Sequence, residues 1–131
     1  MADKQAISTE RAPSAIGPYS QAIKSGNMVF LSGQIPLDPV SMDVVEGDIE
    51  AQARQVLDNL AAVAAEAGGT LDDCVKLTIY MIDLSHFAVV NTTMQQYFQT
   101  PYPARATIEV SALPRGVQVE IDAIMILPAT A

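Results

Sequence analysis

The segment 117–127 places apolar residues on both faces of an extended chain, which strongly restricts the folds available to it. In strand alternation Ile121 and Ala123 lie on one face, and Ile124 and Ile126 lie on the other. A strand that is apolar on both faces is usually covered on both faces. The sheet that contains this segment therefore needs a covering layer on each side.

Hydrophobic periodicity divides the rest of the chain into strands and helices. The segment before Pro18 is expected to be mostly irregular. Ser32 and Gly33 lie inside an apolar strand and indicate a bulge or a close approach of another chain segment. The expected strands are 19–24, 28–35, a short edge strand at 44–45, 74–82 and two strands within 103–121; the expected helices are 48–67 and 85–99.

This order indicates an α+β fold, a single mixed six-stranded sheet with two helices on one face. We expect residues 1–131 to form one domain. Two helices cover only one face of such a sheet, so the other face needs a partner, and a second copy of the chain is the simplest one. The sequence therefore predicts a homo-oligomer.

Charge and composition restrict the partners of the protein. The net charge is −8, and the seven basic residues are scattered along the chain, without the cluster that binding to a phosphate backbone requires. An anion site in such an acidic protein must depend on a locally positioned cation. With a single cysteine, no long apolar run and no signal-like N-terminus, we expect a cytoplasmic protein that binds neither membrane nor nucleic acid.

Two charged residues stand out in the stretch 103–121, which we interpret as a hairpin that turns at 113–116. Arg105 lies between two alanines, and Glu120 lies in an otherwise mostly apolar run, so together they offer a carboxylate-binding fork and an acid in apolar surroundings. A structural salt bridge of Arg105 with Glu109 or Glu120 is the alternative. In a hairpin Glu120 would lie opposite Glu109, about 13 Å from Arg105, so a shared site is easier to build from two subunits.

Other kinds of site are poorly supported by the residues available. The chain has one histidine, His86, and one cysteine, Cys74, so it cannot assemble a His/Cys metal cluster. Cys74 is expected to be a small buried hydrophobic residue and not a nucleophile. Asn91, an amide on the apolar stripe of the second helix, is either tied to backbone or pointed into a site.

Several motifs resemble the Rid family of enamine/imine deaminases, and specifically its RidA branch. They occur in the family's order over nearly the whole chain: AIGPYSQA at 15–22, LSGQIPLDP at 31–39, QARQVLDNL at 52–60, VN at 90–91, PAR at 103–105 and VEI at 119–121. The resemblance implies a chorismate-mutase-like subunit that forms a homotrimer, with sites in the clefts between subunits. It also implies cofactor-independent hydrolysis of 2-iminobutanoate and 2-iminopropanoate, products of PLP-dependent dehydratases, to 2-keto acids and ammonia.

The resemblance also implies roles for individual residues. Arg105 would hold the substrate carboxylate, and Glu120 would activate the attacking water. Thr107 stands where well-known relatives carry cysteine, which makes an essential thiol impossible here and leaves the backbone contact available. The remaining positions that match the family's site are Tyr19 and Ser32, Gly33 and Thr107 through their backbone, Asn91, and Phe87 as an apolar wall.

A binding function without catalysis is the alternative to the deaminase. Such a protein would bind small acids, or would act as a chaperone-like holdase through exposed apolar surface. The family also has members with reported ribonuclease activity, which the scattered bases of this chain disfavour.

Overall fold

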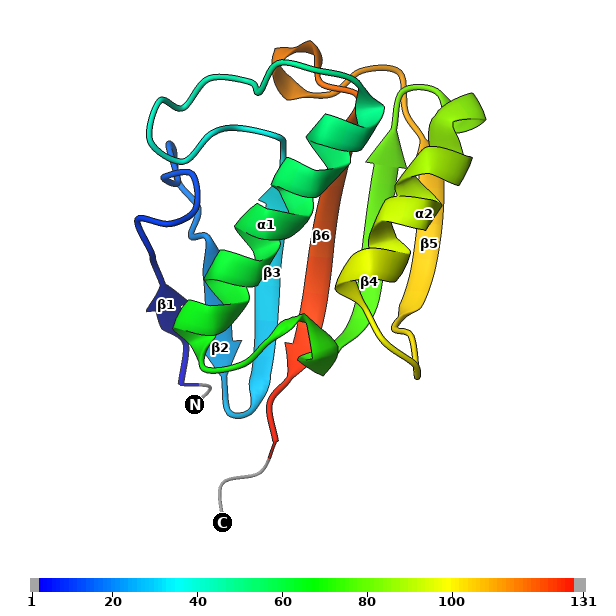
Figure 1. Ribbon diagram of the computed structural model, residues 1–131. Helices are drawn as coiled ribbons and strands as arrows, with labels where there is room; N and C mark the ends of the chain where they lie inside the picture. The colour runs from blue at the N-terminus through cyan, green and yellow to red at the C-terminus, as the bar shows by residue number, and fades with distance from the viewer. Residues whose placement is uncertain (1–2, 129–131) are drawn as a thin grey trace.

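The computed structural model describes residues 3–128, which form one six-stranded sheet with two helices packed on one face (Figure 1). The sheet order is β1-β2-β3-β6-β4-β5, with β4 and β5 parallel and the other neighbours antiparallel. The α+β class and the mixed sheet predicted from the sequence are confirmed. The strands are β1 Gln5–Ile7, β2 Ala22–Ser25, β3 Met28–Gln34, β4 Cys74–Met81, β5 Ala104–Glu109 and β6 Val119–Ile126, and the helices are α1 Ile49–Ala67 and α2 Phe87–Tyr97.

Helix α1 begins and ends at the residues that its sequence signals indicate. The Asp48 carboxylate accepts a hydrogen bond from the Ala51 backbone N–H at 3.0 Å, which satisfies one of the free amides of the first turn. Gly68 ends the helix with a φ of 99°, a left-handed conformation that glycine adopts without a side-chain clash. Helix α2 is shorter than the predicted 85–99, because Leu84–His86 forms a tighter 3-10 turn and the chain is extended at Phe98 before two prolines.

The core lies between the helices and one face of the sheet. Leu77 and Ile79 of β4 and Ile121 of β6 are fully buried beneath Leu57 and Leu60 of α1. Burial of each such side chain stabilises the fold by about 1.5–3 kcal/mol. This layer fixes which face of β4 and β6 is turned toward the helices.

The sixth strand is not where the sequence analysis put it. Val44 makes only an isolated bridge to Leu37, whereas β1, in the N-terminal segment expected to be irregular, pairs with β2. The buried Gln21 side chain anchors this segment: its amide oxygen accepts from Thr9 N at 2.7 Å, and its amide nitrogen donates to the Thr9 and Pro13 carbonyls at 3.0 and 2.7 Å. These hydrogen bonds replace the apolar periodicity that the segment lacks.

The predicted hairpin of 103–121 is wrong, since β5 and β6 do not pair with each other. Strand β4 lies between them, parallel to β5 and antiparallel to β6 (Figure 1). In the sequence, the β4–α2–β5 unit with its parallel strands precedes β6. In the sheet, β6 lies between β3 and β4. A strand that is apolar on both faces is most stable in that central position, with neighbours at both of its edges.

The sheet face away from the helices carries exposed apolar side chains. Met28, Phe30, Ile108 and Ile126 keep 39–44% of their surface exposed. Their partners in the strand register place all four on the face opposite the buried core. Within residues 3–128, no helix is both long and apolar enough to cross a membrane.

Candidate active site

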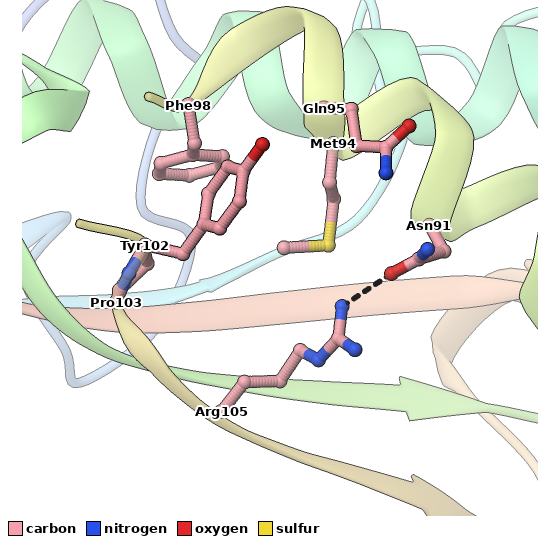
Figure 2. Close-up of a pocket in the computed structure, with 7 residues that line it drawn as sticks. All are labelled: Asn91, Met94, Gln95, Phe98, Tyr102, Pro103 and Arg105. Carbon is pink, nitrogen blue, oxygen red and sulfur yellow. Dashed lines mark hydrogen bonds between the residues drawn. The ribbon is translucent and has the colours of Figure 1, made fainter. Parts of the chain in front are cut away.

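Arg105 is held in place by two residues of α2. It pairs with the buried Leu77 in the β4–β5 register, so its side chain lies on the helix side of the sheet. Its Nη1 donates to Asn91 Oδ1 at 2.6 Å (Figure 2), and its guanidinium carbon lies 5.0 Å from the centre of the Phe87 ring. A hydrogen bond and a cation–π contact thus orient the guanidinium.

The salt bridge considered for Arg105 is absent from the part of the chain that the structure describes. There the only ion pair joins Arg54 to Glu50, at 3.1 Å. Glu109 instead accepts a hydrogen bond from the Leu84 backbone N–H at 3.0 Å. The guanidinium of Arg105 therefore keeps donors that can bind an external carboxylate.

The Arg105 side chain borders a pocket of about 340 Å³ between α2 and the segment that leads into β5 (Figure 2). Most of its walls were not predicted from the sequence: Met94 and Phe98 follow the apolar period of the second helix, which by itself indicates core packing. The lining residues are Asn91, Met94, Gln95, Phe98, Tyr102, Pro103 and Arg105.

Glu120 lies on the other face of the sheet. It pairs with Tyr80, which is three residues from Leu77 on β4, so Glu120 and Arg105 project to opposite faces of one chain. Burial, and secondarily the nearby Asp122 carboxylate, raise the pKa of Glu120 above its ordinary value. Asp122 is itself oriented by the Tyr80 hydroxyl, which donates to its Oδ2 at 3.0 Å.

Gly33 leaves space for the Glu120 side chain. A Cβ atom at position 33 would clash with the Glu120 carboxylate. The β3–β6 register shifts between Leu31 and Gln34, so the strand pairing is irregular at Ser32 and Gly33, where the sequence indicated a bulge or a close approach of another segment. The irregular pairing and the missing side chain together bring the β3 backbone against Glu120.

Tyr19 and Gly33 line a second pocket, of about 310 Å³, and Ser32 lies next to it on β3. Tyr19 is 55% exposed, so its ring is accessible to a ligand. The Ser32 hydroxyl donates to the Ser20 carbonyl at 2.5 Å, which leaves it as an acceptor for a further group. Thr107, in contrast, is on β5 two residues from Arg105 and shares its face of the sheet.

The candidate residues therefore form two groups within one chain. One group, on β5 and α2, contains Arg105, Asn91, Phe87 and Thr107. The other group, near the irregular part of β3, contains Glu120, Gly33, Ser32 and Tyr19.

Cys74 is buried, in agreement with its interpretation as a small hydrophobic residue. Burial, with minor contributions from Asp73 and Asp72, raises the pKa of its thiol to about 12. A thiolate nucleophile at this position is therefore disfavoured at neutral pH.

Comparison with known proteins identifies the family. The family model described as Endoribonuclease L-PSP matches residues 9–127. A 2-iminobutanoate/2-iminopropanoate deaminase from Bos taurus is 42% identical over 123 residues, which are 94% of this chain and 90% of the relative. This chain belongs to the Rid family.

Solved structures of Rid-family proteins match the fold of this chain closely. RidA from the Antarctic bacterium Psychrobacter sp. PAMC 21119 is 48% identical with a TM-score of 0.91, over 94% of this chain and 99% of that one. E. coli TdcF, whose crystal structure contains bound serine, is 41% identical with a TM-score of 0.91, over 95% and 100% of the two chains. The likeness extends over nearly the whole Rid-family domain.

Proposed function

We propose that this Rid-family protein hydrolyses 2-iminobutanoate and 2-iminopropanoate to the 2-keto acids and ammonia. The observation that carries the proposal is the Arg105 guanidinium, which lies at a pocket, is oriented by Asn91 and Phe87, and has no carboxylate partner among residues 3–128. A locally fixed cation is what a small anionic substrate needs in a protein of net charge −8. The relative from Bos taurus named for this reaction supports the choice of substrate.

In the proposed reaction, Arg105 binds the substrate carboxylate and Glu120 accepts a proton from water. The water oxygen adds to the carbon of the protonated C=N group and forms a tetrahedral carbinolamine. Glu120 then returns its proton to the nitrogen, the C–N bond breaks and nitrogen leaves as ammonia, while the hydroxyl gives up its proton to solvent and becomes the ketone. The imine carbon is already electrophilic, so we propose a reaction without metal or cofactor.

The raised pKa of Glu120 suits a general base, because a stronger base accepts the proton of water more readily. Asn91 and Phe87 position Arg105 in this proposal, whereas Tyr19 and Ser32 complete the site on the Glu120 side. The backbone at Gly33 and Thr107 provides hydrogen bonds. Thr107 replaces the cysteine of well-known relatives, so this function requires no thiol at that position.

The active enzyme in this proposal is a homotrimer with sites between subunits. Within one chain, Arg105 and Glu120 lie on opposite faces of the sheet, so the Arg105 group of one subunit must meet the Glu120 group of another. The exposed apolar residues Met28, Phe30 and Ile126 offer a surface for such contacts. Cytoplasmic dehydratases would supply the substrate.

Activity can be tested by generating 2-iminobutanoate with threonine dehydratase and following 2-ketobutanoate release. We expect the wild-type protein to accelerate release, and Arg105→Ala to lose at least about 10²-fold in kcat/KM because the carboxylate is no longer positioned. Circular dichroism would check that the variant is folded. The assignment fails if wild type has no effect or if Arg105→Ala is fully active.

The exposed apolar face also supports the second candidate, a small-acid-binding protein or holdase without catalysis. Protection of a client from aggregation that survives loss of both Arg105 and Glu120 would favour the holdase. A ribonuclease, the activity named in the family description, would need a cluster of cations for the phosphate backbone, whereas the seven basic residues of this chain are scattered along the sequence. Incubation with RNA would test that activity directly.

A further inference from the structure

We infer that the pocket beside Arg105 is a binding subsite for the side chain of larger apolar 2-imino acids, those with branched aliphatic, thioether or aromatic side chains. This inference rests on the proposed function, since it assumes that the substrate carboxylate binds Arg105. It extends that function by assigning substrate selectivity to residues of α2 and of the segment before β5. Tyr102 is the main specificity-determining residue in this subsite.

The pocket continues away from the guanidinium along a largely apolar path. Figure 2 shows the Met94 side chain reaching down from α2 into the space between Arg105 and the Tyr102 ring, with Phe98 behind Tyr102. Met94 and Phe98 are buried and hold fixed positions, whereas Tyr102 is 56% exposed and forms an outer wall. A ligand held at Arg105 can therefore extend its side chain between a methionine and an aromatic ring.

Arg105 and Asn91 form the polar end of the pocket, and its other polar side-chain groups are the Gln95 amide and the Tyr102 hydroxyl. Asn91 Oδ1 is occupied by Arg105, so it does not favour a polar ligand further along. Gln95 is exposed on α2, where its amide can remain hydrated. One polar end and one apolar end are the arrangement that an amphiphilic acid with a carboxylate and a hydrocarbon side chain requires.

The size of the pocket separates long side chains from short ones. A volume of 340 Å³ lies within the range of about 300–1,000 Å³ that is usual for small-molecule pockets. The ethyl group of 2-iminobutanoate would leave most of this space unused. A four-carbon branched chain or a benzyl group would contact Met94 and Tyr102, and each added methylene in an apolar pocket favours the larger substrate by roughly 10-fold or more.

The test compares two imines made by the same generating enzyme. An L-amino-acid oxidase with catalase converts 2-aminobutanoate and leucine to their imines, and semicarbazide traps the imine that remains. We expect wild-type kcat/KM to be about 10-fold or more higher for the leucine-derived imine. Tyr102→Ala should bring this ratio close to one, and Tyr102→Phe should keep it because the ring remains.

Val40→Ala truncates a side chain that is 90% exposed and lies outside the described pockets, so it should leave the ratio unchanged. A folding defect would lower both activities together, whereas loss of the subsite lowers the ratio. A wild-type ratio of one or less, or an unchanged ratio in Tyr102→Ala, would overturn the subsite while leaving the deaminase intact.

Failure of the deaminase proposal itself gives a different result, no acceleration with either imine. Binding then tests the subsite alone, with the stable keto acids 4-methyl-2-oxopentanoate and 2-oxobutanoate followed by amide chemical shifts. If the wild-type protein binds the longer acid more tightly and Tyr102→Ala loses this difference in affinity, the result would support the subsite without catalysis. Equal affinity for the two acids would overturn it.

Discussion

At the scale of single residues, Glu120 and Arg105 differ in how their surroundings affect the charged form of each side chain. Glu120 is half-buried, and the burial together with Asp122 favours its neutral form. Arg105 is exposed and oriented by an amide and an aromatic ring, neither of which neutralises it. The first environment suits a group that takes up a proton, and the second suits a group that binds an anion.

Glu120→Gln should abolish most catalysis and stabilise the fold at neutral pH. Loss of the general base should lower kcat by about 10²–10⁴-fold. The raised pKa means that the wild-type fold is most favoured with Glu120 protonated, at low pH, and that this contribution is lost as pH rises through the raised pKa. Urea unfolding at pH 7 would show the gain, and a variant less stable than wild type would contradict it.

Asp122→Asn should move the acidic limb of the kcat/KM profile to lower pH. Removing the like charge lowers the pKa of Glu120, so the base is ionised in more acidic solution. Carbon NMR of the Glu120 carboxyl group reports the same shift without an activity assay. A titration curve identical to that of wild type would show that Asp122 does not act on Glu120.

Gly33→Ala should lower activity by displacing Glu120. The new Cβ would clash with the carboxylate, and misplacement by about 1 Å can cost on the order of 10²-fold in rate. The atom nearest to the new Cβ is the far end of the Glu120 side chain, which can move aside, so stability should change little. Full activity of Gly33→Ala would show that the carboxylate is not displaced.

At the scale of elements, the Glu120 side of the site depends on how the N-terminal segment is held. Strand β1 is short, and the loop after it has no apolar stripe, so the Gln21 side chain replaces packing with hydrogen bonds. The same segment contributes Pro13 and Ser14 to the pocket that contains Tyr19. Its anchoring therefore shapes the Glu120 side of the site.

Gln21→Leu should destabilise the chain by about 2–4 kcal/mol, because the part-buried backbone groups of Thr9 and the buried carbonyl of Pro13 lose their partners. Gln5→Leu, at an exposed position of β1, is the matched control and should change stability by less than about 0.5 kcal/mol. Equal urea midpoints for the two variants would show that the Gln21 network contributes little.

At the scale of the whole molecule, the opposite placement of Arg105 and Glu120 makes the assembly part of the proposed chemistry. Sedimentation should give about three times the mass of one chain, and a single monomeric species would exclude the proposed trimer. From the sequence, the need for two subunits was inferred from a hairpin of 103–121 that the structure does not contain. The observed strand order supports the same inference for a different reason, since β4 separates the two strands and the side chains leave on opposite faces.

Mixing inactive Arg105→Ala and Glu120→Gln proteins under conditions that allow subunit exchange should restore activity. Each chain then supplies the residue that the other lacks, and with random exchange in equal amounts about a quarter of the sites regain both groups. Each variant incubated alone is the control. No recovery despite demonstrated exchange would mean that Arg105 and Glu120 do not act in a shared site between subunits.

The sequence alone determined the features that depend on local chemistry. The bounds of α1 followed from Asp48, Gly68 and a stripe of apolar residues, and Ser32–Gly33 marked the irregular part of β3, because propensity and periodicity act over a few neighbouring residues. Arg105 and Glu120 were found as chemically unusual residues in their strands. The position of each strand in the sheet depends on competition between distant segments, which periodicity does not record. Only the tertiary structure therefore placed β6 at the centre, revealed β1, assembled the pocket from α2 and the segment before β5, and put Arg105 and Glu120 on opposite faces.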